Sequence, residues 1–201
     1  MNLAKLFETQ RKLDERIIEE KGLQGQNLLD KKILALQVEL GELANEWRGF
    51  KFWSEKQEPN TSSFKCSECG FVREENIDCP LADEHYGFTM DHFNPLLEEY
   101  VDCLHFILSI GLEIEIKQDI FPEPIKYDDA VIQFNELFGQ ISYFASVLNR
   151  DNDWEEVEFE YERVWSLFFG LGGILGFAWV EIEQAYFEKN AENHRRQEVG
   201  Y

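Results

Sequence analysis

The sequence predicts an all-α protein, a bundle of amphipathic helices interrupted by one polar insertion. Apolar residues recur at offsets of three and four in segments spread along the chain, which is typical of helices that bury one face. Residues 55–92 are the exception, because they are polar and poorly periodic. With 201 residues the chain can build a sizeable core. We therefore treat 1–201 as a single domain with 55–92 as an insertion.

The charge balance and the apolar segments limit the partners and the location. The chain has 19 basic and 40 acidic residues and a formal net charge of −21. This balance argues against a protein that binds nucleic acid or an anionic membrane by neutralising phosphate charge. The N-terminal segment MNLAKLFETQRKLDERIIEE has no apolar run like that of a signal peptide. Residues 164–180 lack charge but are short for a membrane span and have acidic flanks. We expect a cytoplasmic protein with no membrane partner.

The first two predicted helices differ in the polar residues they carry. Residues 3–21 read as an amphipathic helix ended by glycines, and Gln10 near its apolar border is an ordinary surface amide when read alone. Residues 31–54 place Glu39, Glu42 and Glu46 on one face beside the apolar stripe. Like charges at these spacings repel, and carboxylates crowded next to a core suit Mg²⁺ or Mn²⁺. The alternative interpretation is an acidic surface face.

The insertion has the pattern of a zinc site. Cys66 and Cys69 form a C-x-x-C pair followed by glycine, and Cys79 and His85 would complete four ligands. A reducing cytoplasm disfavours disulfides, and a loop too polar for a core of its own gains most from a structural Zn²⁺. His92 is an alternative fourth ligand. The other alternative is three unpaired thiols in a mobile loop.

A second acidic pair lies in the next helix. Asn94 and a following proline begin a helix that runs to about residue 111, and it is apolar almost all round. Glu99 and Asp102 stand three apart inside it, where an ionised carboxylate costs several kcal/mol unless it is paired or binds a cation. The alternative is Asp102 bonded to a core histidine or an arginine. The two acidic pairs could face each other across a bundle.

The C-terminal third is predicted to be helical as well. Residues 128–149 are amphipathic, and an aspartate-led capping box at Asp153 opens the next helix. The ending AYFEKNAENHRRQEVGY places Lys189, Asn193 and Arg196 on one helical face. Cations and amides there would suit phosphates and a polar ring edge. The alternative is a solvated, frayed end.

Four segments together resemble the dimeric dUTPases, members of the all-α NTP pyrophosphatase superfamily that includes MazG-like enzymes. The segments are LFETQRKLDERI, VELGELANEWRGFKFWS, EEYVDCLHFILSIGLE and YFEKNAENHRRQEVGY. The resemblance covers both ends and the middle of the chain. It implies a helical bundle of the all-α NTP pyrophosphatase type, a homodimer, Mg²⁺ dependence, and hydrolysis of dUTP to dUMP and pyrophosphate. The cysteine-containing insertion departs from the family's shorter spacing.

The resemblance also implies roles for individual residues. Glu39, Glu42, Glu99 and Asp102 would be metal ligands, and Glu46 a further acid near the metal ions. Deoxyuridine would be held by Gln10, Trp53 and Asn193, and phosphates by Lys51, Lys189 and Arg196. We predict metal-assisted phosphoanhydride hydrolysis, with Glu39, Glu42 and Glu46 as the catalytic carboxylates, one of which takes a proton from water. Two other functions stay open: a related pyrophosphatase acting on another dNTP, such as a dCTPase, and a non-enzymatic, zinc-stapled helical interaction protein.

Overall fold

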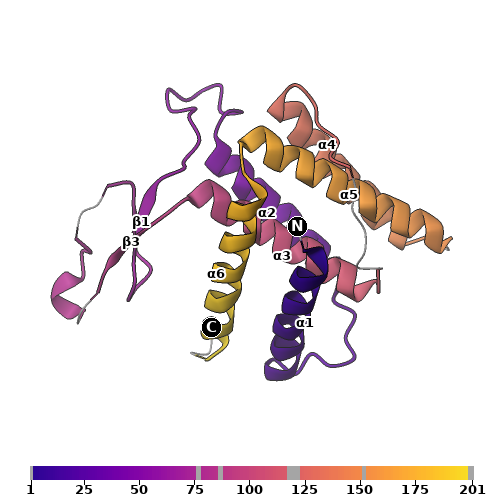
Figure 1. Cartoon of the computed structure of the whole chain (residues 1–201), viewed down its shortest axis with the longest axis horizontal. Helices are drawn as coiled ribbons and strands as arrows, with labels where there is room; N and C mark the ends of the chain where they lie inside the picture. Colours follow the sequence, from indigo (N-terminus) through magenta and orange to yellow (C-terminus); the bar gives the residue numbers. More distant parts are fainter. Residues whose placement is uncertain (1, 76–77, 86–87, 117–122, 151–152, 199–201) are drawn as a thin grey trace.

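The computed structural model describes residues 2–75, 78–85, 88–116, 123–150 and 153–198, and it confirms the all-α fold class (Figure 1). Within these ranges the helices are α1 (Leu3–Glu20), α2 (Leu29–Trp47), α3 (Pro95–Glu113), α4 (Ala130–Leu148), α5 (Trp154–Leu175) and α6 (Trp179–Glu198). A small sheet and a short 3-10 helix, η1 (Ala82–Glu84), lie between α2 and α3.

Helix α3 is the centre of the bundle. It contacts α1, α2, α5 and α6, which explains why its sequence is apolar on nearly every side. The predicted start is confirmed, because the Asn94 side chain accepts a hydrogen bond from the amide of Leu97 and Pro95 takes the first helical position. Helices α4 and α5 pack on each other, and α4 also contacts α2. Because α3 contacts α2 directly, the two acidic helices lie side by side.

Helix α2 is shorter than the sequence predicted. It ends at Trp47 because Arg48 adopts a left-handed backbone with a φ of 64°, and a series of tight turns follows. The expected continuation of this helix to residue 54 was wrong. The apolar period of residues 33–47 does not indicate that Arg48 would adopt a left-handed backbone conformation. L-residues other than Asn and Asp rarely adopt it. Lys51 and Trp53 consequently lie on the turn after the helix and not on its acidic face.

The insertion contains more regular structure than its sequence indicated. Three antiparallel strands, β1 (Ser63–Cys66), β2 (Val72–Arg73) and β3 (Met90–Phe93), form a sheet in the order β2-β1-β3. Strands of two to four residues are too short to show the alternation by which a strand is recognised. The sheet stands to one side of the helices (Figure 1).

No single helix in the described ranges is long and apolar enough to cross a membrane. Helices α5 and α6 meet that criterion only when taken together, and they are bent by 106° relative to each other. The bend follows Gly176, which ends α5 with a φ of 85°. Much of the apolar stretch in α5 is core: Trp165, Phe168 and Leu171 are fully buried.

Candidate active site

Three carboxylates from the two acidic helices meet at one point. Glu39 and Glu42 are almost one turn apart on α2, and Glu99 faces them from α3, so that one oxygen of each lies within 4.8 Å of the others. One oxygen of Glu99, Oε2, is buried and has no hydrogen-bond partner among the residues described. A buried, unpartnered carboxylate oxygen beside two other carboxylates fits a hard divalent cation such as Mg²⁺ or Mn²⁺.

Crowding and burial change the acidity of this cluster. Burial, with Asp102 and Glu42 nearby, raises the pKa of Glu39 to about 7, although Lys189 opposes the rise. Burial raises the pKa of Glu99 to about 8, with further contributions from Asp102 and the two glutamates of α2. Near neutral pH the cluster therefore holds protons that an incoming cation would displace.

Without divalent cations, the free energy of unfolding should fall as pH rises. An unfolded chain releases protons from these glutamates near pH 4.5, whereas folded Glu39 and Glu99 retain them to about 7 and 8. Between these values the folded state binds more protons, so each step up in pH favours unfolding until the loss is complete above pH 8. Allowing for solvent screening, we expect the free energy of unfolding to fall by ~1–3 kcal/mol over this pH range. This corresponds to a fall in Tm of roughly 2–10 °C.

The measurement is a thermal melt at pH 6.0 and pH 8.5 in buffer stripped of divalent cations without a chelator. Added Mg²⁺ should raise Tm more at the higher pH. The Glu99→Gln variant is the control, and its melts should depend less on pH. A wild-type Tm that is equal or higher at pH 8.5 would contradict the raised pKa values.

Asp102 does not join the group of three. Its Oδ2 lies 2.7 Å from Nζ of Lys189 on α6, and the same ammonium is 2.7 Å from Oε1 of Glu98. Burial raises the pKa of Asp102, and Lys189 opposes the rise. Burial lowers the pKa of Lys189, but Asp102 and Glu98 outweigh it and the net shift is upward. An ammonium ion thus sits beside the acidic cluster and ties α6 to α3.

Glu98 was missed by sequence analysis. It adjoins Glu99 but points to a different partner, and helix periodicity alone assigned it no role. Lys189 was expected at phosphates, and the structure instead pairs it with two carboxylates. The side chains of Lys189 and Asp102 are only 10 % and 18 % exposed, so this pairing is shielded from solvent.

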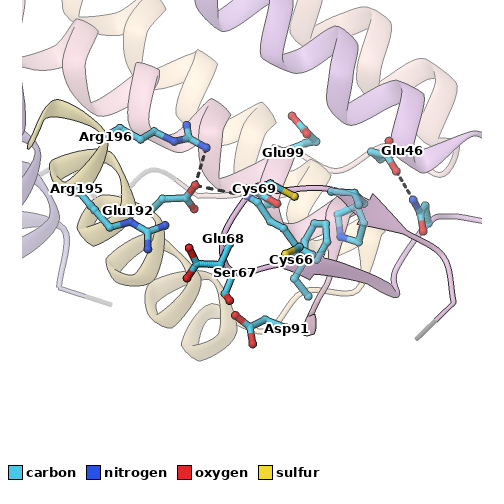
Figure 2. Close-up of a pocket in the computed structure, with 17 residues that line it drawn as sticks. Glu46, Cys66, Ser67, Glu68, Cys69, Asp91, Glu99, Glu192, Arg195 and Arg196 are labelled. Atoms are coloured by element: carbon cyan, nitrogen blue, oxygen red, sulfur yellow. Dashed lines mark hydrogen bonds and ion pairs between the residues drawn. The ribbon is translucent and has the colours of Figure 1, made fainter. Parts of the chain in front are cut away.

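A cavity of about 1050 Å³ opens next to Glu99 (Figure 2). One wall comes from the helices, and the facing wall comes from the insertion. The helical wall includes Glu46, Glu98, Glu99, Glu192, Arg195 and Arg196, and the insertion contributes Asn60, Lys65, Cys66, Ser67, Glu68 and Cys69. Glu46 is fixed there because its Oε2 accepts a hydrogen bond of 2.8 Å from Asn60. The cavity therefore joins acidic side chains with cations from α6 and β1.

The residues expected to bind a nucleotide are scattered. Arg196 lines the cavity, and its guanidinium is 2.7 Å from Glu192. Lys51 donates to the carbonyl of Asn45, and Trp53 is 66 % exposed. Asn193 is half-buried on α6. Lys51, Trp53 and Asn193 are outside the lining of this cavity.

Gln10 is a core residue and not a surface amide. It is 3 % exposed, and its Oε1 accepts a hydrogen bond of 2.9 Å from the Tyr186 hydroxyl and lies 2.7 Å from Nδ1 of His105. Its amide donates to Asp14. Burying an amide with its hydrogen bonds satisfied holds α1, α3 and α6 together, so this structure gives Gln10 a supporting role away from the cavity.

The four predicted zinc ligands come together in the insertion. One ligand atom each of Cys66, Cys69, Cys79 and His85 lies within 4.8 Å of the others. The Cys69 and Cys79 sulfurs are 3.6 Å apart, and the Cys66 sulfur is 3.6 Å from Nδ1 of His85. Tetrahedral zinc would separate two sulfurs by ~3.8 Å and a sulfur from a nitrogen by ~3.6 Å, given its bond lengths. The alternative ligand, His92, instead bonds Ser62.

Local backbone geometry prepares this cluster. Gly70 has a φ of 71°, which lets the chain turn back so that backbone amides point at sulfur. Burial would raise the pKa of the Cys66 thiol, but the amides of Cys69 and Glu68 lower it to about 7. The thiolate is the form that binds metal.

A protein-family model described as dUTPase matches residues 2–79 and 89–201. No curated protein matches the chain. No solved structure matches it either.

Proposed function

The chain belongs to the dUTPase family of nucleotide pyrophosphatases, and we propose that it hydrolyses dUTP to dUMP and pyrophosphate with Mg²⁺ or Mn²⁺ as the cofactor. The observation that carries the proposal is the convergence of Glu39, Glu42 and Glu99 within 4.8 Å beside a large cavity. An acidic surface face would not account for Glu99, which is half-buried with one oxygen that has no partner among the described residues. We also propose the cytoplasm as the compartment and a homodimer as the assembly.

Each carboxylate has a proposed task. Glu39, Glu42 and Glu99 would hold the cation, and Asp102 would be available as a further ligand if Lys189 paired with substrate phosphate in place of Asp102. A bound cation would polarise the phosphoanhydride and lower the pKa of a coordinated water. Glu46 lines the same cavity with one carboxylate oxygen bonded to Asn60, which leaves the other free to take a proton from water. Arg196 and Lys189 compensate charge on the phosphates.

We propose a structural Zn²⁺ at Cys66, Cys69, Cys79 and His85. The supporting observations are the convergence of the four ligand atoms within 4.8 Å, the two distances of 3.6 Å among them, and the lowered pKa of Cys66. Sulfur and imidazole ligands prefer zinc to magnesium. The two proposed metal sites therefore differ in ligand chemistry and in the cations they select.

A panel of deoxynucleoside triphosphates tests the proposed function. We expect Mg²⁺-dependent release of pyrophosphate from dUTP, with lower kcat/KM for dCTP and dTTP. Cytosine would leave a buried donor or acceptor unpaired, and thymine would be excluded by its 5-methyl group. Preference for another base would assign the site to a related pyrophosphatase. No pyrophosphate from any triphosphate would overturn the enzymatic proposal and favour an interaction protein.

A further inference from the structure

We propose that the zinc-bound insertion is part of the substrate site, and that Lys65 on β1 binds the phosphates of the nucleotide. This inference rests on the proposed function, because it assigns a new residue to the same cavity. It gives the insertion a role that the family resemblance does not supply. Figure 2 shows Cys66, Ser67 and Cys69 on one side of the cavity and Glu99 on the other.

Lys65 spans the cavity from the insertion to the helices. Its Nζ lies 3.5 Å from Oε1 of Glu192 on α6 and 3.9 Å from Oε1 of Glu98 on α3. The side chain is 30 % exposed and lines the cavity. An ammonium in this position can reach a ligand held between the sheet and the two helices.

Three cations converge on the same two carboxylates. Lys65 and Lys189 share the Oε1 atom of Glu98, while Lys65 and Arg196 share the Oε1 atom of Glu192. Lys189 also pairs with Asp102, so three positive charges face three carboxylates and the cluster is balanced in charge. This cluster adjoins Glu99, whose carboxylate belongs to the proposed cation site. A magnesium-bound triphosphate needs that combination, with carboxylates for the metal and cations for the phosphate oxygens.

The zinc ligands fix the position of Lys65. Lys65 directly precedes Cys66, and both belong to the central strand of the sheet. Strands of two to four residues are marginal by themselves, so the metal cluster would supply the rigidity that holds the strand opposite α6. Zinc would therefore act on substrate binding by positioning Lys65, without touching the nucleotide.

A purely structural role for Lys65 predicts different behaviour. Partly exposed ion pairs stabilise a protein by only ~0–1 kcal/mol, so a tether between insertion and helices would affect Tm slightly and phosphate affinity not at all. The distinguishing measurement is the binding of inorganic pyrophosphate in Mg²⁺ by calorimetry, together with KM and kcat for dUTP.

The test compares Lys65→Met with Lys56→Met. Lys56 is also in the insertion, but its pair with Glu74 is 3.6 Å long and both side chains are at least 75 % exposed. We expect Lys65→Met to keep about one zinc per chain by elemental analysis, to weaken pyrophosphate binding about tenfold, and to raise KM by a similar factor, as one charge-assisted contact is lost. Its kcat should change less than about threefold. Lys56→Met should behave as wild type.

A third variant tests the link to zinc. Cys69→Ser should lose zinc and weaken pyrophosphate binding as much as Lys65→Met does, and the double variant should be no weaker than either single one. Unchanged pyrophosphate affinity in Lys65→Met would overturn the inference. A wild-type protein without zinc, or a zinc-free Cys69→Ser with normal affinity, would overturn the part assigned to the metal.

The two proposals fail in different ways. A wild-type chain that binds magnesium pyrophosphate through Lys65 but hydrolyses no triphosphate would sink the proposed reaction and leave the binding role of Lys65 standing. A wild-type chain that hydrolyses dUTP, with Lys65→Met equal to it in both affinity and KM, would overturn the role of Lys65 alone.

Discussion

Replacing Glu99 by glutamine is expected to lower kcat for dUTP by at least roughly 10²–10³-fold, the range for losing one preorganised electrostatic contact. Glu99 offers a buried, unpartnered oxygen to the proposed cation, and an amide retains the shape but not the charge. Without metal at pH 7, Tm should stay within ~2 °C, because a carboxyl with a pKa of about 8 is already neutral and resembles an amide.

The decisive readout is the rise in Tm produced by Mg²⁺, which wild type should show and Glu99→Gln should largely lose. Glu113→Gln is the matched control, since Glu113 lies on the same helix and pairs with Lys32 at 2.6 Å instead of facing the cluster. It should retain both activity and the response to Mg²⁺. Near-normal turnover of Glu99→Gln at saturating Mg²⁺ would remove Glu99 from the metal site.

Replacing Lys189 by methionine should lower both stability and activity. The ammonium is the shared partner of Glu98 and Asp102. Its removal takes away the cation that pairs with Asp102 in a shielded site, and it leaves Glu98 with the longer contact of 3.9 Å to Lys65. We expect a loss of ~1–3 kcal/mol in the free energy of unfolding, below the cost of breaking a fully buried pair because Asp102 and Glu98 keep some contact with water. Added Mg²⁺ should recover part of it.

The same variant should reduce kcat/KM for dUTP about 100-fold, which corresponds to ~2.7 kcal/mol of transition-state stabilisation. The ratio of kcat/KM for dUTP to that for dCTP should be unchanged, because an ammonium that faces carboxylates and phosphates does not read the base. Lys12→Met is the control, since its pair with Glu8 is 66 % exposed on both sides. A tenfold change in the base ratio would instead place Lys189 at the base.

Several features of the fold were readable from the sequence because they are local. The period of apolar residues located α1, α3 and α4 to within a few residues, but it did not show the end of α2 or the break between α5 and α6. The helix starts at Asn94 and Asp153 were also correct, because a side chain that caps a helix bonds an amide only two or three residues away. The zinc ligands were likewise proposed from spacing, and the fold brings Cys66, Cys69, Cys79 and His85 together.

The sequence alone determined that this chain is helical, that two of its helices carry acidic pairs, and that it resembles the dUTPases. Only the tertiary structure decided that Asp102 turns to Lys189, that Gln10 is buried against Tyr186, and that Lys65 crosses from the insertion to α6. The physical reason is the separation along the chain between the residues that interact. Helical faces and caps depend on neighbours within about one turn, whereas pairing between charges depends on which distant segments the core brings into contact.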